Sequence, residues 1–91
     1  VDDLDRARGA FQLAVAADPD DARARTLFTQ TSRTMADKYY KRGVVALQRQ
    51  DLDGAIAAWD KVLDIDPNYK DAQLSRAQAL QLKKNLKKIG G

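Results

Sequence analysis

The chain contains two prolines, and each follows an aspartate at the end of the same apolar pattern. The first copy of the pattern is DLDRARGAFQLAVAADPDD and the second is DLDGAIAAWDKVLDIDPNY. Because a proline forces the residue before it out of the helical region, each pattern ends where a helix must stop. Pro19 and Pro67 lie 48 positions apart. Any fold for this chain must therefore accommodate two similar helices that recur at this unusual distance.

A third break, from Gln50 to Gly54, supplies turn residues and a cap for the segment that follows. The three breaks leave four segments, which we expect to be helices at about 3–17, 21–50, 53–65 and 69–88. Each segment has apolar residues at helical spacing, and good helix formers dominate the composition. No stretch of useful length alternates as a strand would. We therefore predict an all-α fold with one domain that spans 1–91.

The second segment has an unusual length. No proline or glycine lies between Asp21 and Gly43, and one helical face is kept throughout the segment. The residues on that face are Phe28, Ser32, Met35, Tyr39, Gly43 and Ala46. The pattern predicts one extended helix at about 21–50. Residues 29–34 are rich in threonine and serine, which lower helix propensity, so a kink or break there is the alternative.

Two series of residues have the same spacing of four, three and five. They are Ala55, Trp59, Val62 and Pro67, and Ala7, Phe11, Ala14 and Pro19. Together with Tyr39 and Gly43 before the second series, this layout resembles the tetratricopeptide repeat (TPR), a helix-turn-helix unit of about 34 residues. The resemblance implies a TPR-like helical repeat. Residues 1–21 would be the second helix of a truncated repeat, 36–69 a complete repeat, and 70–88 a closing helix. A generic α-helical bundle is the alternative.

A weaker likeness concerns residues 39–89, which are similar to the repeat region of bacterial envelope proteins that join a LysM module to TPRs. It would imply the bacterial periplasm or envelope. The chain has no LysM sequence, so the localisation stays open. Since the chain opens without methionine, we expect it to be a fragment of a longer protein.

Composition excludes several kinds of chemistry. The chain has neither cysteine nor histidine, so disulfides, thiolate zinc sites and histidine-dependent catalysis are excluded. The aspartate clusters lack the glycine and ligand spacing of a calcium loop and are better explained as helix stops and caps. We therefore predict no enzyme, catalytic residue, metal or cofactor. No apolar run approaches the roughly 20 residues of a membrane span, so we expect no direct membrane insertion.

In the TPR family the first helices of the repeats line a concave face. The resemblance therefore implies a non-catalytic interaction module that binds a partner protein or peptide in this groove. The predicted groove residues are Tyr40, Lys41, Val44, Leu47, Gln48, Leu74 and Gln78. Tyr40, Val44 and Leu47 recur at helical spacing and form an apolar strip that suits a docked peptide. The alternative is that Tyr40 and Val44 contact a neighbouring helix.

The segment at 3–17 would lack the first helix of its own repeat. Four apolar side chains on this segment would then be partly bare: Leu4, Phe11, Leu13 and Val15. Burying one such side chain stabilises by roughly 1.5–3 kcal/mol. We therefore predict a homodimer, with a swapped dimer as one of its forms. Structural self-assembly as a segment of a bacterial envelope protein is the alternative function.

Positive charge is concentrated near the end of the chain. The net charge of the protein is +3. Residues 70–91 contain six lysines and arginines and a single acidic residue, Asp71. Lys83, Lys84, Lys87 and Lys88 suit the negative end of a helix macrodipole and a solvated surface. Attraction to nucleic acid or to an anionic membrane are the alternatives. No aromatic stacking platform flanks these lysines, so we expect no nucleic-acid partner.

Overall fold

Four α-helices make up the structure, which is a computed structural model that describes residues 2–90. The helices are α1 (Asp2–Ala17), α2 (Ala22–Gln48), α3 (Leu52–Ile65) and α4 (Lys70–Gly90). Residues 2–90 contain no strand. The predicted all-α class and the four helical segments are therefore confirmed.

The helix ends follow from the turn residues of the sequence. The α1 helix ends at Ala17, directly before the Asp18-Pro19 pair. The carboxylate of Asp21 then caps α2 by accepting hydrogen bonds from the N–H groups of Arg23 and Ala24 at 3.0 and 3.2 Å. In the same way, Asp51 caps α3 by accepting from the N–H of Gly54 at 2.9 Å.

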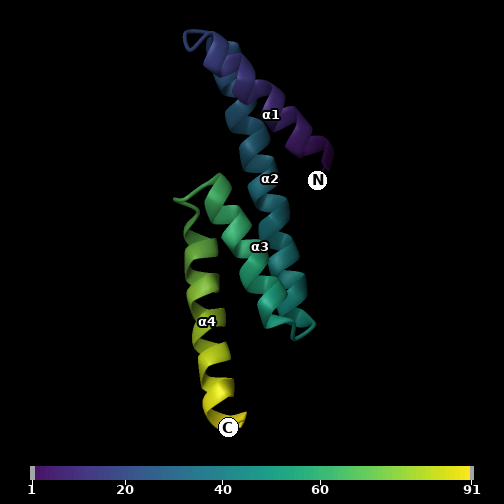
Figure 1. Cartoon of the computed structure of the whole chain (residues 1–91), viewed down its shortest axis with the longest axis vertical. Helices are drawn as coiled ribbons and strands as arrows, with labels where there is room; N and C mark the ends of the chain where they lie inside the picture. Colours follow the sequence, from purple (N-terminus) through teal and green to yellow (C-terminus); the bar gives the residue numbers. More distant parts are fainter. Residues whose placement is uncertain (1, 91) are drawn as a thin grey trace.

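The α2 helix runs unbroken for 27 residues, or about 40 Å. Its threonines do not interrupt it, because two of their hydroxyls bond within the helix. Thr26 donates to the carbonyl of Ala22 at 2.9 Å, and Thr34 donates to the carbonyl of Gln30 at 3.0 Å. The single extended helix is confirmed, and the alternative of a break at 29–34 is wrong (Figure 1).

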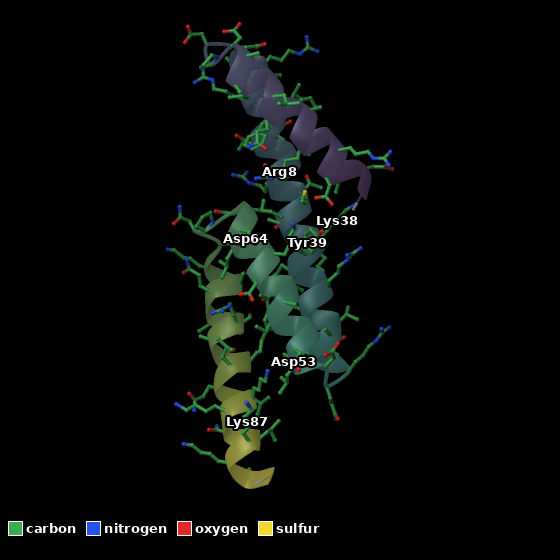
Figure 2. All side chains as sticks on the ribbon, in the orientation of Figure 1. Arg8, Lys38, Tyr39, Asp53, Asp64 and Lys87 are labelled. Atoms are coloured by element: carbon green, nitrogen blue, oxygen red, sulfur yellow. The ribbon has the colours of Figure 1, made fainter. Side chains whose placement is uncertain are left out.

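Because α2 is long, its two neighbouring helices α1 and α3 pack at different positions along it. Figure 1 shows α1 beside the first half of α2 and α3 beside its second half, with α4 on the far side of α3. Arg8 holds the α1 contact: its Nε donates to Ser32 Oγ at 2.9 Å, and its guanidinium lies 5.1 Å from the centre of the Phe28 ring (Figure 2). The result is an elongated molecule of 55 × 21 × 17 Å.

The main core lies between the second half of α2, α3 and the first half of α4. Its fully buried members are Ala36, Ala55, Trp59, Val62, Ala72 and Ala79. Trp59 is 1% exposed and fits against Gly43, where an added Cβ would lie 2.3 Å from the indole nitrogen. The glycine that the repeat pattern places four residues after Tyr39 therefore makes room for the tryptophan.

Candidate functional site

A groove of about 240 Å³ runs between the second half of α2 and α4. We call it the peptide groove. It is lined by Tyr40, Val44, Leu47, Trp59, Ser75, Gln78, Ala79 and Leu82. Trp59 comes from α3, between the two walls. Leu47 and Leu82 are 40% and 44% exposed, so the groove offers apolar surface to solvent.

Tyr40 is held in place on the α2 wall by contacts with three neighbours. Its hydroxyl lies 3.2 Å from Ser75 Oγ on α4, and its ring stacks on Tyr69 with 5.4 Å between the centroids. Its backbone carbonyl accepts a hydrogen bond from the indole N–H of Trp59 at 3.2 Å. The groove wall is therefore pre-organised, which lowers the entropy cost of binding.

Tyr69 is in turn fixed by Asp37, to which its hydroxyl donates a hydrogen bond of 2.7 Å. Burial, followed by the hydrogen bond to Asp37 and the charge of that carboxylate, raises the pKa of Tyr69 to about 12. The phenol therefore stays protonated at neutral pH and keeps donating to Asp37.

The structure brings together four of the seven residues that were predicted to bind a partner. Tyr40, Val44, Leu47 and Gln78 all line the peptide groove. Tyr40 and Val44 are partly buried and also pack against the main core, so only part of each side chain faces the groove. The sequence prediction missed Trp59, Ala79 and Leu82. The helical spacing of Ser75, Ala79 and Leu82 on α4 could have indicated the Leu82 position.

The other three predicted residues are exposed but lie outside the lining of the peptide groove. Leu74 is on α4 and Gln48 is at the end of α2. Lys41 lies on the lining of a second groove on α2. Its position, one residue after Tyr40, turns it about 100° around the helix, since successive helical residues are rotated by that angle.

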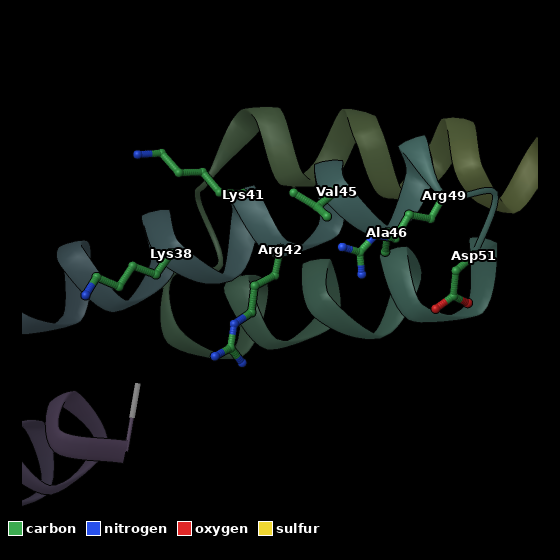
Figure 3. A pocket seen from close by; sticks show the side chains of 7 residues that line it. All are labelled: Lys38, Lys41, Arg42, Val45, Ala46, Arg49 and Asp51. Atoms are coloured by element: carbon green, nitrogen blue, oxygen red, sulfur yellow. The ribbon is translucent and has the colours of Figure 1, made fainter.

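The second groove, which we call the basic groove, has a volume of about 650 Å³. It is lined by Lys38, Lys41, Arg42, Val45, Ala46, Arg49 and Asp51 (Figure 3). The guanidinium of Arg42 lies 5.4 Å from the centre of the Tyr39 ring, so this side chain is anchored at the helix surface. This groove was not predicted from the sequence.

The four residues predicted for self-association fall into two groups. Leu4, Phe11 and Val15 are half-buried, whereas Leu13 is 72% exposed. The apolar side of α1 is therefore partly covered by the fold, and Leu13 lies outside that covered side.

The lysines near the end of α4 differ in their surroundings. Lys83 forms an ion pair with Asp53 at 2.5 Å, which joins α4 to the first turn of α3. The hydrogen bond from Lys83, together with its charge, lowers the pKa of Asp53. Lys84, Lys87 and Lys88 are exposed, in agreement with a solvated surface, and Figure 2 shows Lys87 near the C-terminal end of α4.

Two further properties concern residues 2–90. None of their helices is both long and apolar enough to cross a membrane. These residues also contain no group of three or more aspartates, glutamates, histidines or cysteines placed to hold a metal ion.

Comparison with known proteins assigns the class of this fold. The TPR repeat family model matches residues 45–84, which cover the end of α2, all of α3 and most of α4. This part of the chain is therefore similar to a TPR repeat, and the resemblance and the TPR-like fold are confirmed. The division at 1–21, 36–69 and 70–88 stays a prediction.

A single relative illustrates how far the similarity reaches. An uncharacterized protein of Methanocaldococcus jannaschii is 34% identical over 47 residues, which are 52% of this chain and 55% of that protein. The chain thus spans about half the length of this relative. No solved structure matches the chain. These findings do not support the LysM likeness or a bacterial origin, which stay predictions.

Proposed function

We propose that this chain is a non-catalytic interaction module that binds the apolar side chains of a partner protein or peptide in the peptide groove. TPR repeats generally mediate protein–protein interaction, and part of this chain is similar to one. The observation that carries the finer proposal is the convergence of Tyr40, Val44 and Leu47 from α2 with Gln78 and Leu82 from α4 in one groove.

The lining indicates the kind of peptide that fits. Its exposed surface is mainly leucine and valine, with the Gln78 amide and the Ser75 hydroxyl on the α4 wall. A peptide with two or three apolar side chains on one face would bury them against Leu47 and Leu82. Its backbone or a polar side chain would hydrogen-bond to Gln78. Because the walls are already held by the contacts of Tyr40, binding requires little rearrangement.

The test is a selection of peptides from a displayed random library on the 1–91 chain, followed by titration of the selected peptides. Trp59 is the single tryptophan and lines the groove, so its fluorescence reports binding. We expect Leu47→Asp to weaken binding about tenfold or more, because it places a charge on the apolar contact. Leu80→Asp is the matched control, since Leu80 is 39% exposed on α4 but does not line the groove.

A second control concerns the basic end of α4. Alanine at Lys83, Lys84, Lys87 and Lys88 should leave the affinity of the selected peptides unchanged, because these side chains do not line the groove. Peptides that bind wild type and Leu47→Asp equally well would place the binding site elsewhere. Loss of binding in the lysine variant would favour an electrostatic contact at the end of α4.

A further inference from the structure

The basic groove continues the face of α2 that α1 covers. Seven residues make nearly two helical turns, so residues seven apart lie in a row along the helix. Phe28, Met35, Arg42 and Arg49 form such a row. The Phe28 end contacts Arg8 of α1, whereas Arg42 and Arg49 line the basic groove. One half of this face is therefore covered by a helix and the other half is open.

The open half has room for a helix. Lys38 and Arg49, the outermost basic residues of the groove, are about 16 Å apart along α2 at 1.5 Å per residue. Val45 lies between them and is 43% exposed. Figure 3 shows Lys38, Lys41, Arg42, Val45 and Ala46 spread along α2, with Lys41 and Arg42 pointing to different sides and Arg49 and Asp51 beyond the end of the helix. The purple helix α1 lies beyond the Lys38 end. The α1 helix of 16 residues is about 24 Å long and would span the groove.

The outer side of α1 complements this surface. It presents Leu13, which is 72% exposed, among the exposed small residues Ala10, Ala14 and Ala17. Aspartates flank it at both ends, at positions 2, 3 and 5 before it and at 18, 20 and 21 after it. With two arginines, residues 2–21 carry a net charge of −4, whereas the lining of the basic groove carries +3.

We infer that the protein forms a two-fold homodimer in which the outer side of α1 of each copy lies on the basic groove of the other. Within one copy, α1 runs antiparallel to α2 (Figure 1). A two-fold axis that crosses α2 near residue 36 places the covered half of α2 in one copy opposite the open half of α2 in the other copy. It places Leu13 of one copy over Val45 of the other, Asp5 near Lys38, and the acidic turn near Arg49. Each contact then occurs twice, as two-fold symmetry requires.

This dimer does not depend on the proposed function. The peptide groove and the basic groove share none of their lining residues, so peptide binding and dimer formation can each fail alone. Dimer formation is therefore measured without any peptide.

The first experiment is sedimentation of the 1–91 chain over a wide range of concentrations. We expect a shift from the mass of one chain to that of two. Leu13→Lys should raise the dimer dissociation constant roughly tenfold or more, because both copies lose an apolar contact and place a positive charge on the basic groove. Leu86→Lys is the control: Leu86 is 50% exposed on α4, outside the proposed interface, and its change should have no effect. A one-chain mass at every concentration, or equal dissociation constants for wild type and Leu13→Lys, overturns the dimer.

The second experiment is an exchange of charges between the two surfaces. One variant carries Lys38→Glu and Arg49→Glu, which change the charge of the groove lining from +3 to −1. The other carries Asp3→Lys, Asp5→Lys and Asp20→Lys, which change the charge of residues 2–21 from −4 to +2. Each variant alone should remain a monomer, because its two surfaces then have the same sign. An equal mixture should form a mixed dimer, because each groove now meets an opposite charge on the other chain. Native mass spectrometry distinguishes these species by mass. Dimers of either variant alone, or no dimer in the mixture, overturn the proposal.

Salt provides a further readout of the same contact. The Debye length falls from about 10 Å at 0.1 M to about 3 Å at 1 M salt, so charge attraction between the two copies is screened. The wild-type dissociation constant should therefore rise with salt. A dissociation constant that falls or stays constant as salt is added would contradict a contact that depends on opposite charges.

Discussion

Gly43 and Trp59 pack closely against each other in the main core. The addition of one methyl group at Gly43 tests this contact. An added Cβ at Gly43 would lie 2.3 Å from the indole nitrogen, so the ring would have to move. Overpacking of this kind costs about 1–3 kcal/mol, and the higher helix propensity of alanine offsets part of it. We expect Gly43→Ala to lower the free energy of unfolding by about 1–2 kcal/mol, measured by urea titration with circular dichroism at 222 nm.

Gly9 provides the matched control for this change. It also lies inside a helix, but no atom comes within 4 Å of an added Cβ. Gly9→Ala should therefore stabilise α1 by about 0.5–1 kcal/mol, because alanine is the better helix former. If both variants were stabilised equally, the close contact between Gly43 and Trp59 would not exist in solution.

Tyr69 should make stability depend on pH in the alkaline range. Its hydrogen bond to Asp37 contributes about 1 kcal/mol relative to Tyr69→Phe. The folded-state pKa of about 12 exceeds the ordinary value of 10, so this contribution is complete below pH 10 and is lost as the pH rises toward 12. Urea titrations of the wild type and of Tyr69→Phe from pH 8 to pH 12 should show that the difference between their free energies of unfolding shrinks. A constant difference would mean that the phenol titrates normally.

The residue scale also shows what the sequence could and could not predict. The spacing of Tyr39, Gly43 and Trp59 indicated a repeat, because packing of an aromatic ring against a glycine leaves a recognisable pattern. Lys41 was predicted for the same groove as Tyr40, but it lines the basic groove, because successive residues of a helix are turned by about 100°. Four of seven predicted groove residues nevertheless lie together.

At the scale of a single helix, the backbone just after the end of α2 has a strained conformation that can be tested. Gln50 has a φ of 64°, in the left-handed region that favours glycine. Its N–H donates to the carbonyl of Leu47, and the N–H of Asp51 donates to that of Ala46, both at 2.9 Å, which closes the helix. We expect Gln50→Gly to raise the free energy of unfolding by on the order of 0.5–1 kcal/mol.

Thermal unfolding followed by circular dichroism measures this gain. Gln48→Gly is a suitable control, since Gln48 lies in the last turn of α2 and should lose stability on the same change. A loss of stability in both variants would contradict the left-handed conformation at Gln50.

The helices themselves were predictable because their ends depend on local chemistry. Asp-Pro pairs and capping aspartates stop and start helices wherever they occur, so both ends of all four helices agreed with the prediction within a few residues. The threonine-rich part of α2 was ambiguous for a physical reason. Hydroxyls can compete with a helix or bond inside it, and the sequence does not reveal which of these occurs.

At the scale of the whole molecule, the basic groove could not have been predicted from the order of the helices. It exists because α1 packs beside the first half of α2 and leaves part of the same face open. That outcome depends on how far α1 lies along α2. The length of α2 places α1 away from the region where α3 and α4 pack.

The length of α2 also has a consequence for cooperativity. Trp59 and the rest of the main core lie between α2, α3 and α4, while α1 packs beside the other end of α2. Elements that share few buried contacts can open separately and exchange their amide hydrogens at different rates. At concentrations where sedimentation gives the mass of one chain, amides of α1 and of the first turns of α2 should exchange well before those around Trp59. Hydrogen exchange followed by NMR would then show two levels of amide protection along the continuous helix α2. Uniform protection would instead show that α2 opens as one cooperative unit over its whole length.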